Sequence, residues 1–311
     1  MGAKTLAAVM LVIAAGVVGG LYLLSAPHPV NASSLPQHVP DPTNGEVMYN
    51  AGGCISCHKP AAGQGEGDAT LPSGGVPFNT PAGTFYPPNI TPDRETGIGA
   101  WSDANFVNAV QHGISPDGTH YIPAFPYSSY GRMRVEDVLD LKAYLFSLPA
   151  VKGERRPPEV MLGSVGEAVM RRATGLWKLL RGDARRIVHH ADESGPWNRG
   201  AYLVDAPGHC GECHTPRNFL MIPIASEKFQ GGPHPEGKGK VPSLIDLVGR
   251  KRYKDADDLA NALRFGETFG YDKLSSGGMG AVQTNLSKLP EGDIKAIATY
   301  LVGLTGSRSR Q

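Results

Sequence analysis

The pattern Cys-x-x-Cys-His occurs twice in the sequence, at residues 54–58 and again at residues 210–214. Together the two copies use all 4 cysteines of the chain. Two thiols at this spacing can add across the vinyl groups of a porphyrin, and the adjacent histidine then lies under the ring as an axial iron ligand. Because only 10 of the 311 residues are histidine, chance is a poor explanation for both copies. The pattern therefore predicts two covalently bound haem c groups.

The two motifs supply the attachment thiols and the proximal iron ligands. The predicted thiols are Cys54, Cys57, Cys210 and Cys213, and the predicted proximal ligands are His58 and His214. A structural zinc site is the alternative for paired Cys-x-x-Cys motifs. Zinc ribbons bring two such pairs together over a short spacing, whereas these pairs lie in opposite halves of the chain. We therefore prefer haem.

An electron carrier also needs a sixth iron ligand, since full coordination prevents oxygen chemistry. Methionine sulfur is the usual choice, and it raises the reduction potential relative to a second histidine. In the second half, Met279 lies in the glycine-rich stretch 276–280, ahead of the last predicted helix. A methionine in such a loop is not at a core position. We predict that Met279 is the sixth ligand of the second haem.

The first half is less regular. Met133 is the only methionine between the first motif and residue 150, and it lies farther beyond its preceding helix than Met279 does. A strict repeat would place the sulfur near residues 125–126, where the sequence has none. Either Met133 reaches in from a rearranged loop, or His112 or His120 binds the iron instead. We predict Met133 and keep the two histidines as alternatives.

An internal repeat relates the two halves. Residues 102–113 and 255–266 match without a gap, and each segment begins with a helix N-cap residue and ends with a glycine typical of a helix C-terminus. Amphipathic helices are predicted near 135–148 and from residue 290. The repeat predicts an all-α fold with two tandem haem domains after an N-terminal transmembrane helix.

The predicted organisation, in chain order, is a membrane anchor or signal peptide (1–24), a tether (25–43), haem domain 1 (44–150), a helical connector (151–195), haem domain 2 (196–306) and a tail (307–311). Basic and apolar residues alternate along the connector between residues 169 and 186. We expect this helix to strap the two domains together with its apolar face. A helix that docks a partner or lies on a membrane surface is the alternative.

Several residues beside the motifs are candidates for tuning the haems. Pro88 and Pro242 follow their motifs at similar distances, so each is expected to place its carbonyl on the second ring nitrogen of the proximal histidine. His209 precedes the second motif and is a candidate for lining the haem edge. Arg217 is a candidate partner for a haem propionate, and a surface role is the alternative.

Composition excludes some function classes. The net charge is +1 and charged residues make up 19%, which gives no sign of a nucleic-acid partner. Glycine (40) and proline (26) are abundant while aromatic residues are 7%, a composition typical of long loops and a thin core that haem would fill. We find no nucleophile elbow, phosphate loop or dinucleotide fingerprint.

The N-terminus contains an uncharged apolar run from Leu6 to Leu24, preceded by Lys4. At about 1.5 Å per residue the run is just long enough to cross a bilayer core of about 30 Å. Lys4 favours a cytoplasmic N-terminus, which places the rest of the chain in the periplasm. A cleaved signal peptide is the alternative, although Pro27 and Pro29 fit poorly beside a cleavage site. We expect a single inner-membrane anchor.

Five stretches of the chain resemble the multihaem cytochrome c subunits of membrane-bound alcohol, aldehyde and sugar dehydrogenases, over about residues 42 to 304. They are residues 86–93, 97–102, 121–127, 197–203 and 208–218. The resemblance implies class I cytochrome c domains that pass single electrons from a periplasmic dehydrogenase to quinone, another cytochrome or a terminal oxidase. It also supports Met133, because those subunits carry a methionine in the stretch that corresponds to residues 130–133.

This chain departs from that family in its haem count. The better-known members have three haems and this chain has two motifs, so the particular partner stays open. An alternative function is a dihaem redox enzyme, similar to a thiosulfate dehydrogenase or a peroxidase, with catalysis at haem 1. Such an enzyme would need an open or labile ligand position there.

Overall fold

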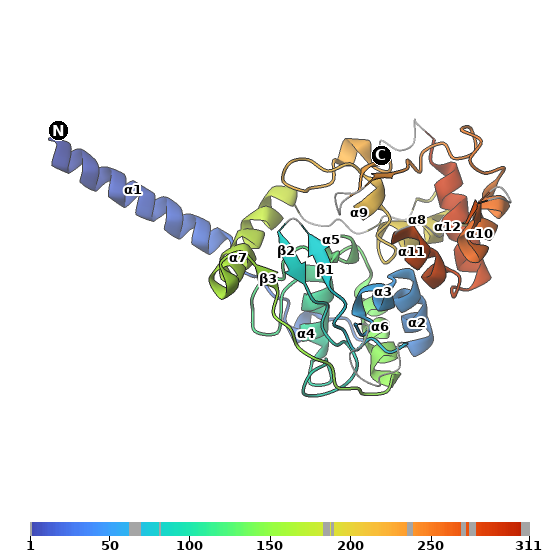
Figure 1. Ribbon diagram of the computed structural model, residues 1–311, viewed down its shortest axis with the longest axis horizontal. Helices are drawn as coiled ribbons and strands as arrows, with labels where there is room; N and C mark the ends of the chain where they lie inside the picture. The colour runs from blue at the N-terminus through green and yellow to red at the C-terminus, as the bar shows by residue number, and fades with distance from the viewer. Residues whose placement is uncertain are drawn as a thin grey trace.

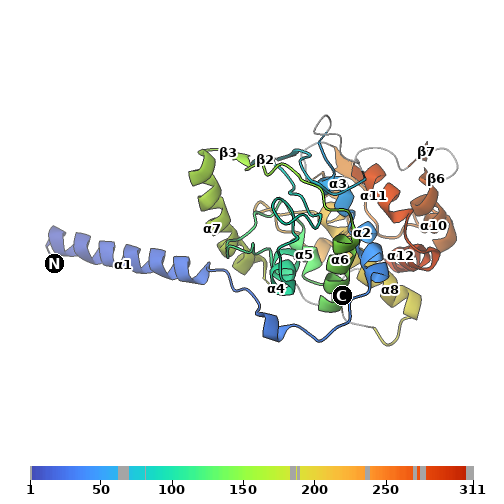
Figure 2. The same cartoon turned by 90° about the horizontal axis from the view of Figure 1, so that it is seen from below.

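A computed structural model describes residues 2–61, 70–80, 82–182, 187, 190–234, 239–268, 272–273 and 278–305 (Figure 1). Helices dominate the described residues, as the sequence predicts. The N-terminal helix α1 (Ala3–Leu24) projects away from the rest of the molecule, and all of its residues are at least partly exposed (Figures 1 and 2). Within the described ranges, α1 is the one helix that is long and apolar enough to cross a membrane.

The helices of the two halves follow the same order. After a short 3-10 turn η1 (Ala32–Ser34), the first half contains α2 (Pro42–Ala51), α3 (Cys54–His58), α4 (Asp103–Val107), the π-helical turn η2 (Asn108–His112), α5 (Tyr127–Tyr130) and α6 (Val135–Ser147). The connector contains α7 (Gly163–Arg181). The second half contains α8 (Gly195–Asp205), α9 (Gly211–His214), the 3-10 turn η3 (Ala225–Glu227), α10 (Ala256–Phe265), α11 (Gly278–Leu286) and α12 (Glu291–Gly303).

The predicted repeat segments fold alike. Ser102 caps α4 by accepting a hydrogen bond from the Asn105 amide, and Asp255 caps α10 in the same way. Both segments end on a glycine in the left-handed conformation, Gly113 with φ 55° and Gly266 with φ 77°. The capping prediction is therefore confirmed at both ends of both segments.

A close helix crossing also recurs in each half, where α2 packs on α6 and α8 packs on α12. A Cβ atom added to Gly45 would lie 2.0 Å from the carbonyl oxygen of Asp140, and one added to Gly200 would lie 1.9 Å from that of Ala296. No side chain fits in either space. Gly45 therefore allows α2 and α6 to touch, and Gly200 allows α8 and α12 to touch.

Short strands pair parts of the loops with one another. The all-α prediction did not include these strands. β1 (Phe78–Thr80), β2 (Gly83–Phe85) and β3 (Glu159–Val160) form one antiparallel sheet, while β4 (Gly232–Pro233) pairs with β5 (Lys240–Val241) and β6 (Glu267–Thr268) with β7 (Asp272–Lys273). Each strand has two or three residues, so these ladders fix loops and leave the cores helical.

The connector helix α7 does bridge the two halves, but with its polar side chains. Lys178 Nζ donates to the carbonyls of His112 and Gly113 at 2.6 and 3.0 Å, and Trp177 Nε1 donates to the carbonyl of Leu220 at 2.8 Å. The prediction that α7 packs its apolar face against the domains is wrong, because Val169 and Leu180 are 63% and 68% exposed.

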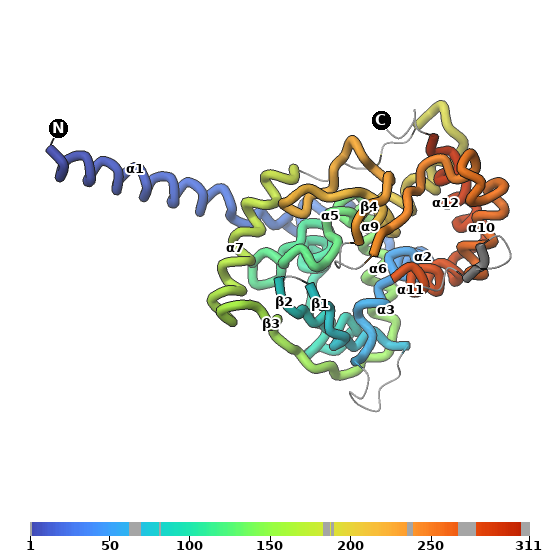
Figure 3. The backbone as a smooth tube through the Cα atoms, turned by 45° about the horizontal axis from the view of Figure 1, so that its top comes forward, coloured from blue at the N-terminus to red at the C-terminus, as the bar shows by residue number. Residues whose placement is uncertain are grey.

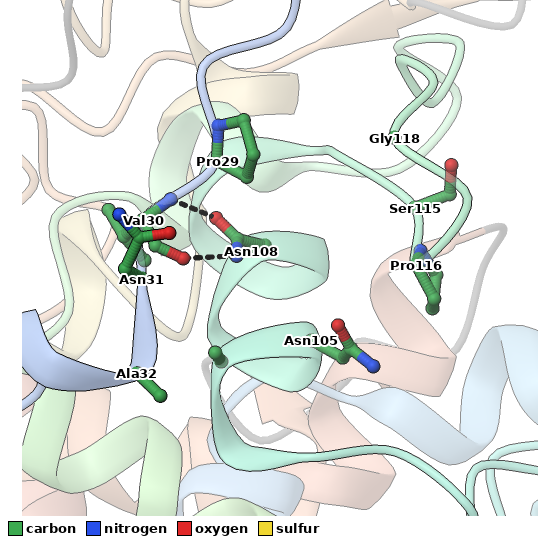
Figure 4. A pocket seen from close by; sticks show the side chains of 10 residues that line it. Pro29, Val30, Asn31, Ala32, Asn105, Asn108, Ser115, Pro116 and Gly118 are labelled. Carbon is green, nitrogen blue, oxygen red and sulfur yellow. Dashed lines mark hydrogen bonds between the residues drawn. The ribbon is translucent and has the colours of Figure 1, made fainter.

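The tether after α1 is fixed to the first half. The side-chain amide of Asn108 accepts a hydrogen bond from the Val30 amide at 2.8 Å and donates one to the Val30 carbonyl at 2.9 Å (Figure 4). This contact lies in a shallow pocket that is lined by residues 29–32 and by residues between 104 and 118. The pocket contains no residue of either haem motif.

Candidate haem-binding sites

The first haem motif lies at the end of α2, where Gly53 turns the chain sharply into α3. Its φ of 58° is in the left-handed region that glycine tolerates without strain. The turn leaves Cys54 half-buried, Cys57 exposed and His58 at the end of α3. The second motif follows α8 similarly, with Cys210 half-buried and Cys213 exposed. All four thiols are free of disulfides, as haem attachment requires.

The proximal histidines have the predicted carbonyl partners. His58 Nδ1 lies 2.7 Å from the carbonyl oxygen of Pro88, and His214 Nδ1 lies 2.7 Å from that of Pro242. A carbonyl can only accept, so the ring proton is on Nδ1 and the Nε2 lone pair is left for iron. Burial lowers the pKa of both histidines, which favours the neutral form that ligates metals.

The predicted methionine ligands lie in different surroundings. Met133 follows α5 and is 1% exposed, and its carbonyl accepts a hydrogen bond from Gln111 Nε2 at 2.8 Å. Met279 lies in the first turn of α11 and is half-buried against the core. Of the predicted glycine-rich stretch 276–280, residues 276–277 lie outside the described residues, and residues 278–280 begin α11 instead of forming a loop. Both side chains would offer iron a soft sulfur ligand.

His120 and His112, the alternatives to Met133 as sixth ligand of haem 1, lie in different surroundings from Met133. His120 Nε2 donates to the carbonyl of Ser25 at 2.9 Å, and Nδ1 accepts from Lys178 Nζ at 2.9 Å. Both ring nitrogens of His120 are therefore engaged at the end of α1. His112 is exposed at the end of η2. Met133 stays our prediction for the sixth ligand.

Residues beside the first motif fit a haem better than zinc. Tyr130 Oη donates to the Gly52 carbonyl at 3.2 Å, and its pKa is raised well above the usual value by burial and then by the nearby thiols of Cys54 and Cys57. Tyr49 Oη is buried and has no hydrogen-bond partner among the described residues, so it can serve a polar edge of the cofactor. Across the same residues, no group of three or more His, Cys, Asp or Glu side chains gathers as a zinc site requires.

Residues next to the two motifs meet at the backbone carbonyl of Gly52. Gly52, two residues before Cys54, accepts hydrogen bonds from Tyr130 and from His209 Nε2, the latter at 3.3 Å. The His209 ring also packs edge-on against Tyr130, with 5.6 Å between ring centroids. His209 directly precedes Cys210, so the candidate haem-edge residue of the sequence instead links the two attachment sites.

A pair of reciprocal contacts completes this junction. In the first motif, Ser56 Oγ accepts from Asn285 Nδ2 of α11 at 2.7 Å. In the second motif, Glu212 Oε1 accepts from Ser129 Oγ of α5 at 2.8 Å. In both cases the third residue of a motif binds the opposite half. Figure 3 shows the corresponding arrangement, with α11 beside α2 and α3.

Sequence reasoning missed these interface residues. The two positions between the motif cysteines accept almost any side chain, so the pattern carries no signal for Ser56 or Glu212. Arg217, a candidate propionate partner, forms an ion pair with Glu212 and also donates to its carbonyl at 2.8 Å. It therefore fixes Glu212 toward Ser129.

Comparisons with known proteins agree with this geometry. A family model described as cytochrome c matches residues 42–149. A dihaem c-type cytochrome of Cereibacter sphaeroides is 42% identical over 259 residues, which are 83% of this chain and 84% of that protein.

Cytochrome subunits of dehydrogenases are also similar. The fructose dehydrogenase cytochrome subunit of Gluconobacter japonicus is 34% identical over 88% of this chain and 54% of its own length. The cytochrome c subunit of the quinone alcohol dehydrogenase of Gluconacetobacter polyoxogenes is 34% identical over 84% of this chain and 55% of its own length. The chain thus spans about half the length of these two subunits. It belongs to the cytochrome c family, in the group that contains a dihaem cytochrome and the cytochrome subunits of alcohol and fructose dehydrogenases.

Proposed function

We propose that the protein is a dihaem cytochrome c that relays single electrons between two haems of one chain and catalyses no bond chemistry itself. Family membership implies covalent haem c and electron transfer. The observation that carries the two-centre relay is the Gly52 carbonyl, which contacts Tyr130 of the first half and His209 of the second. Attachment sites joined in this way keep the two cofactors close.

The proposed ligand sets are His58 with Met133 for haem 1 and His214 with Met279 for haem 2. When bound, haem iron supplies the one-electron chemistry. The Pro88 and Pro242 carbonyls hold each imidazole by its Nδ1–H, which fixes the ring and keeps Nε2 directed away from the carbonyl. Met133 and Met279 would each hold the iron through sulfur, which would keep oxygen from binding, as an electron carrier requires.

The proposed donor is supported by the names of the relatives, and the proposed acceptor comes from the family resemblance of the sequence. Those named as subunits serve alcohol and fructose dehydrogenases, and we infer that a periplasmic dehydrogenase also supplies electrons to this chain. The acceptor is quinone, another cytochrome or a terminal oxidase. We further propose that α1 stays in the inner membrane and that both haem domains, residues 44–150 and 196–306, face the periplasm.

Ligand variants test this function. The purified chain should contain two haems and show a methionine–iron charge-transfer band from each. Met133→Ala and Met279→Ala should each remove about half of that band, whereas Met221→Ala, at a 51% exposed loop residue, should leave it unchanged. A wild-type haem 1 that binds carbon monoxide readily in the reduced state would favour the enzyme alternative and contradict the carrier.

A further inference from the structure

Helix α7 presents an apolar stripe to the outside of the molecule. The members lie three, four or seven residues apart, which places them along one face of a helix. They are Leu162, Val165, Val169, Leu176 and Leu180, with Leu179 beside the last. All except Leu176 are more than half exposed. Exposure of a continuous apolar face of this length to water is unfavourable.

The charged side chains of α7 point the other way. Arg171 pairs with Glu167 at 2.7 Å and donates to the carbonyl of His120 at 3.0 Å. Lys178 donates to carbonyls of the first half, as described above. Burial lowers the pKa of Lys178 to about 8, so its place against the protein has an electrostatic cost. A helix on a water-exposed surface would have the opposite orientation, with its charges outside.

The middle of α7 lies where α1 leaves the molecule. The Arg172 guanidinium stacks on the ring of Tyr22 at 3.8 Å and also donates to the Tyr22 carbonyl. A Cβ on Gly175 would lie 2.2 Å from the carbonyl oxygen of Ser25, so the two segments touch directly. Figures 1 and 2 both show α7 lying across the C-terminal end of α1. The Asn108–Val30 contact further fixes this end of the tether.

The second half extends the same surface. The Trp177 hydrogen bond holds Leu220 beside the C-terminal part of α7. This loop exposes Phe219, Leu220 and Met221 by 90%, 36% and 51%. Phe219, Leu220 and Met221 at this loop tip are all apolar, as the stripe residues are.

We propose that the outer face of α7 and the loop 219–221 lie in the surface of the phospholipid bilayer that α1 crosses. This proposal rests on α1 being a retained anchor, and it is independent of the haem ligands. The bilayer is the partner that the structure favours, because α7 contacts the end of the one helix among the described residues that can span a membrane.

Photocrosslinking of the full chain tests the proposal. The photoreactive residue benzoyl-phenylalanine would replace Val169 on the stripe, Leu11 within α1, or Val39, a valine that is 89% exposed in the tether. The haem-loaded proteins would be irradiated in vesicles of phosphatidylcholine and phosphatidylglycerol and weighed by mass spectrometry. We expect lipid adducts at positions 169 and 11 and none at position 39.

The controls separate the outcomes. Unchanged haem spectra in each variant show that the fold and the redox centres are intact, so a negative result concerns α7 alone. Adducts at position 11 without adducts at position 169 would overturn the proposal while leaving the anchor in place. Protein–protein adducts at position 169, in vesicles or in native membranes that contain the dehydrogenase, would also overturn it, because they would assign the stripe to another chain.

Discussion

Ser129 Oγ donates a hydrogen bond to Glu212 Oε1 at 2.8 Å, which joins the helix before Met133 to the interior of the second haem motif. The Ser56–Asn285 contact makes the same connection in the opposite direction. Each motif is therefore positioned partly by the half that contains the other motif. Movement of one half would disturb both attachment sites.

A double-mutant cycle tests this coupling. Ser129→Ala and Glu212→Ala should each lower the free energy of unfolding, because each removes a partner from a half-buried hydrogen bond. Together they should cost less than the sum, with a coupling energy of about 0.5–1.5 kcal/mol. Denaturant unfolding of the haem-loaded chain measures the four stabilities. Strictly additive losses would show that this contact does not join the halves.

The helix crossing predicts a large effect from one methyl group. Gly200→Ala should lower the free energy of unfolding by about 1–3 kcal/mol, because the added carbon would lie 1.9 Å from the Ala296 carbonyl oxygen and the helices would have to separate. Gly195→Ala is the matched control in the same helix, since a Cβ there meets nothing within 4 Å. Thermal unfolding compares the two. Equal effects would contradict the crossing.

Acid should weaken the contact between the halves through Asp137. Burial acts to raise the pKa of this carboxyl, but hydrogen bonds from Arg134, Tyr202 and Asn44 lower it overall. A lowered pKa contributes stability above the unfolded value of about 3.9, and this stability is lost as pH falls through the folded value. Asp137→Asn should be less stable than wild type at pH 7, and the difference should shrink below about pH 4.

Alkali should act in the opposite sense at Lys178. Burial, and then Arg181, lowers its pKa to about 8, below its ordinary value of 10.5. Between these pH values the unfolded chain binds more protons, so this residue makes stability rise with pH in that window. Wild type should gain about 2 kcal/mol relative to Lys178→Met between pH 8 and 10, measured by denaturant unfolding. A constant difference across this range would contradict the shift.

The features that the sequence could predict depend on residues that are close together in the chain or that recur at a similar spacing. The caps at Ser102 and Asp255 depend on residues a few positions away, so the pattern alone is sufficient. The carbonyl partners of His58 and His214 were predictable because each proline recurs at a similar distance after its motif. The Ser129–Glu212 contact joins residues far apart in the chain, and no local rule brings them together.

Helix α7 shows a different limit. Its apolar periodicity predicts one apolar face, but periodicity does not say whether that face points to protein or away from it. The carbonyls of His112 and Gly113 accept hydrogen bonds from Lys178, which holds the charged face of the helix against the first half. The short strands were also unpredictable, because two or three residues are too few for an alternating pattern.

The hydrogen-bonded pair of Asn108 and Val30 has a consequence for how electrons reach this protein. It clamps the chain only a few residues after α1 ends, so little slack remains for the haem domains to swing away from the bilayer. With α1 in the membrane, the cytochrome would meet its donor and acceptor by lateral diffusion or within a fixed complex. The protein would then reach only partners in a thin layer above the lipid, even though the length of the tether suggests a wider reach.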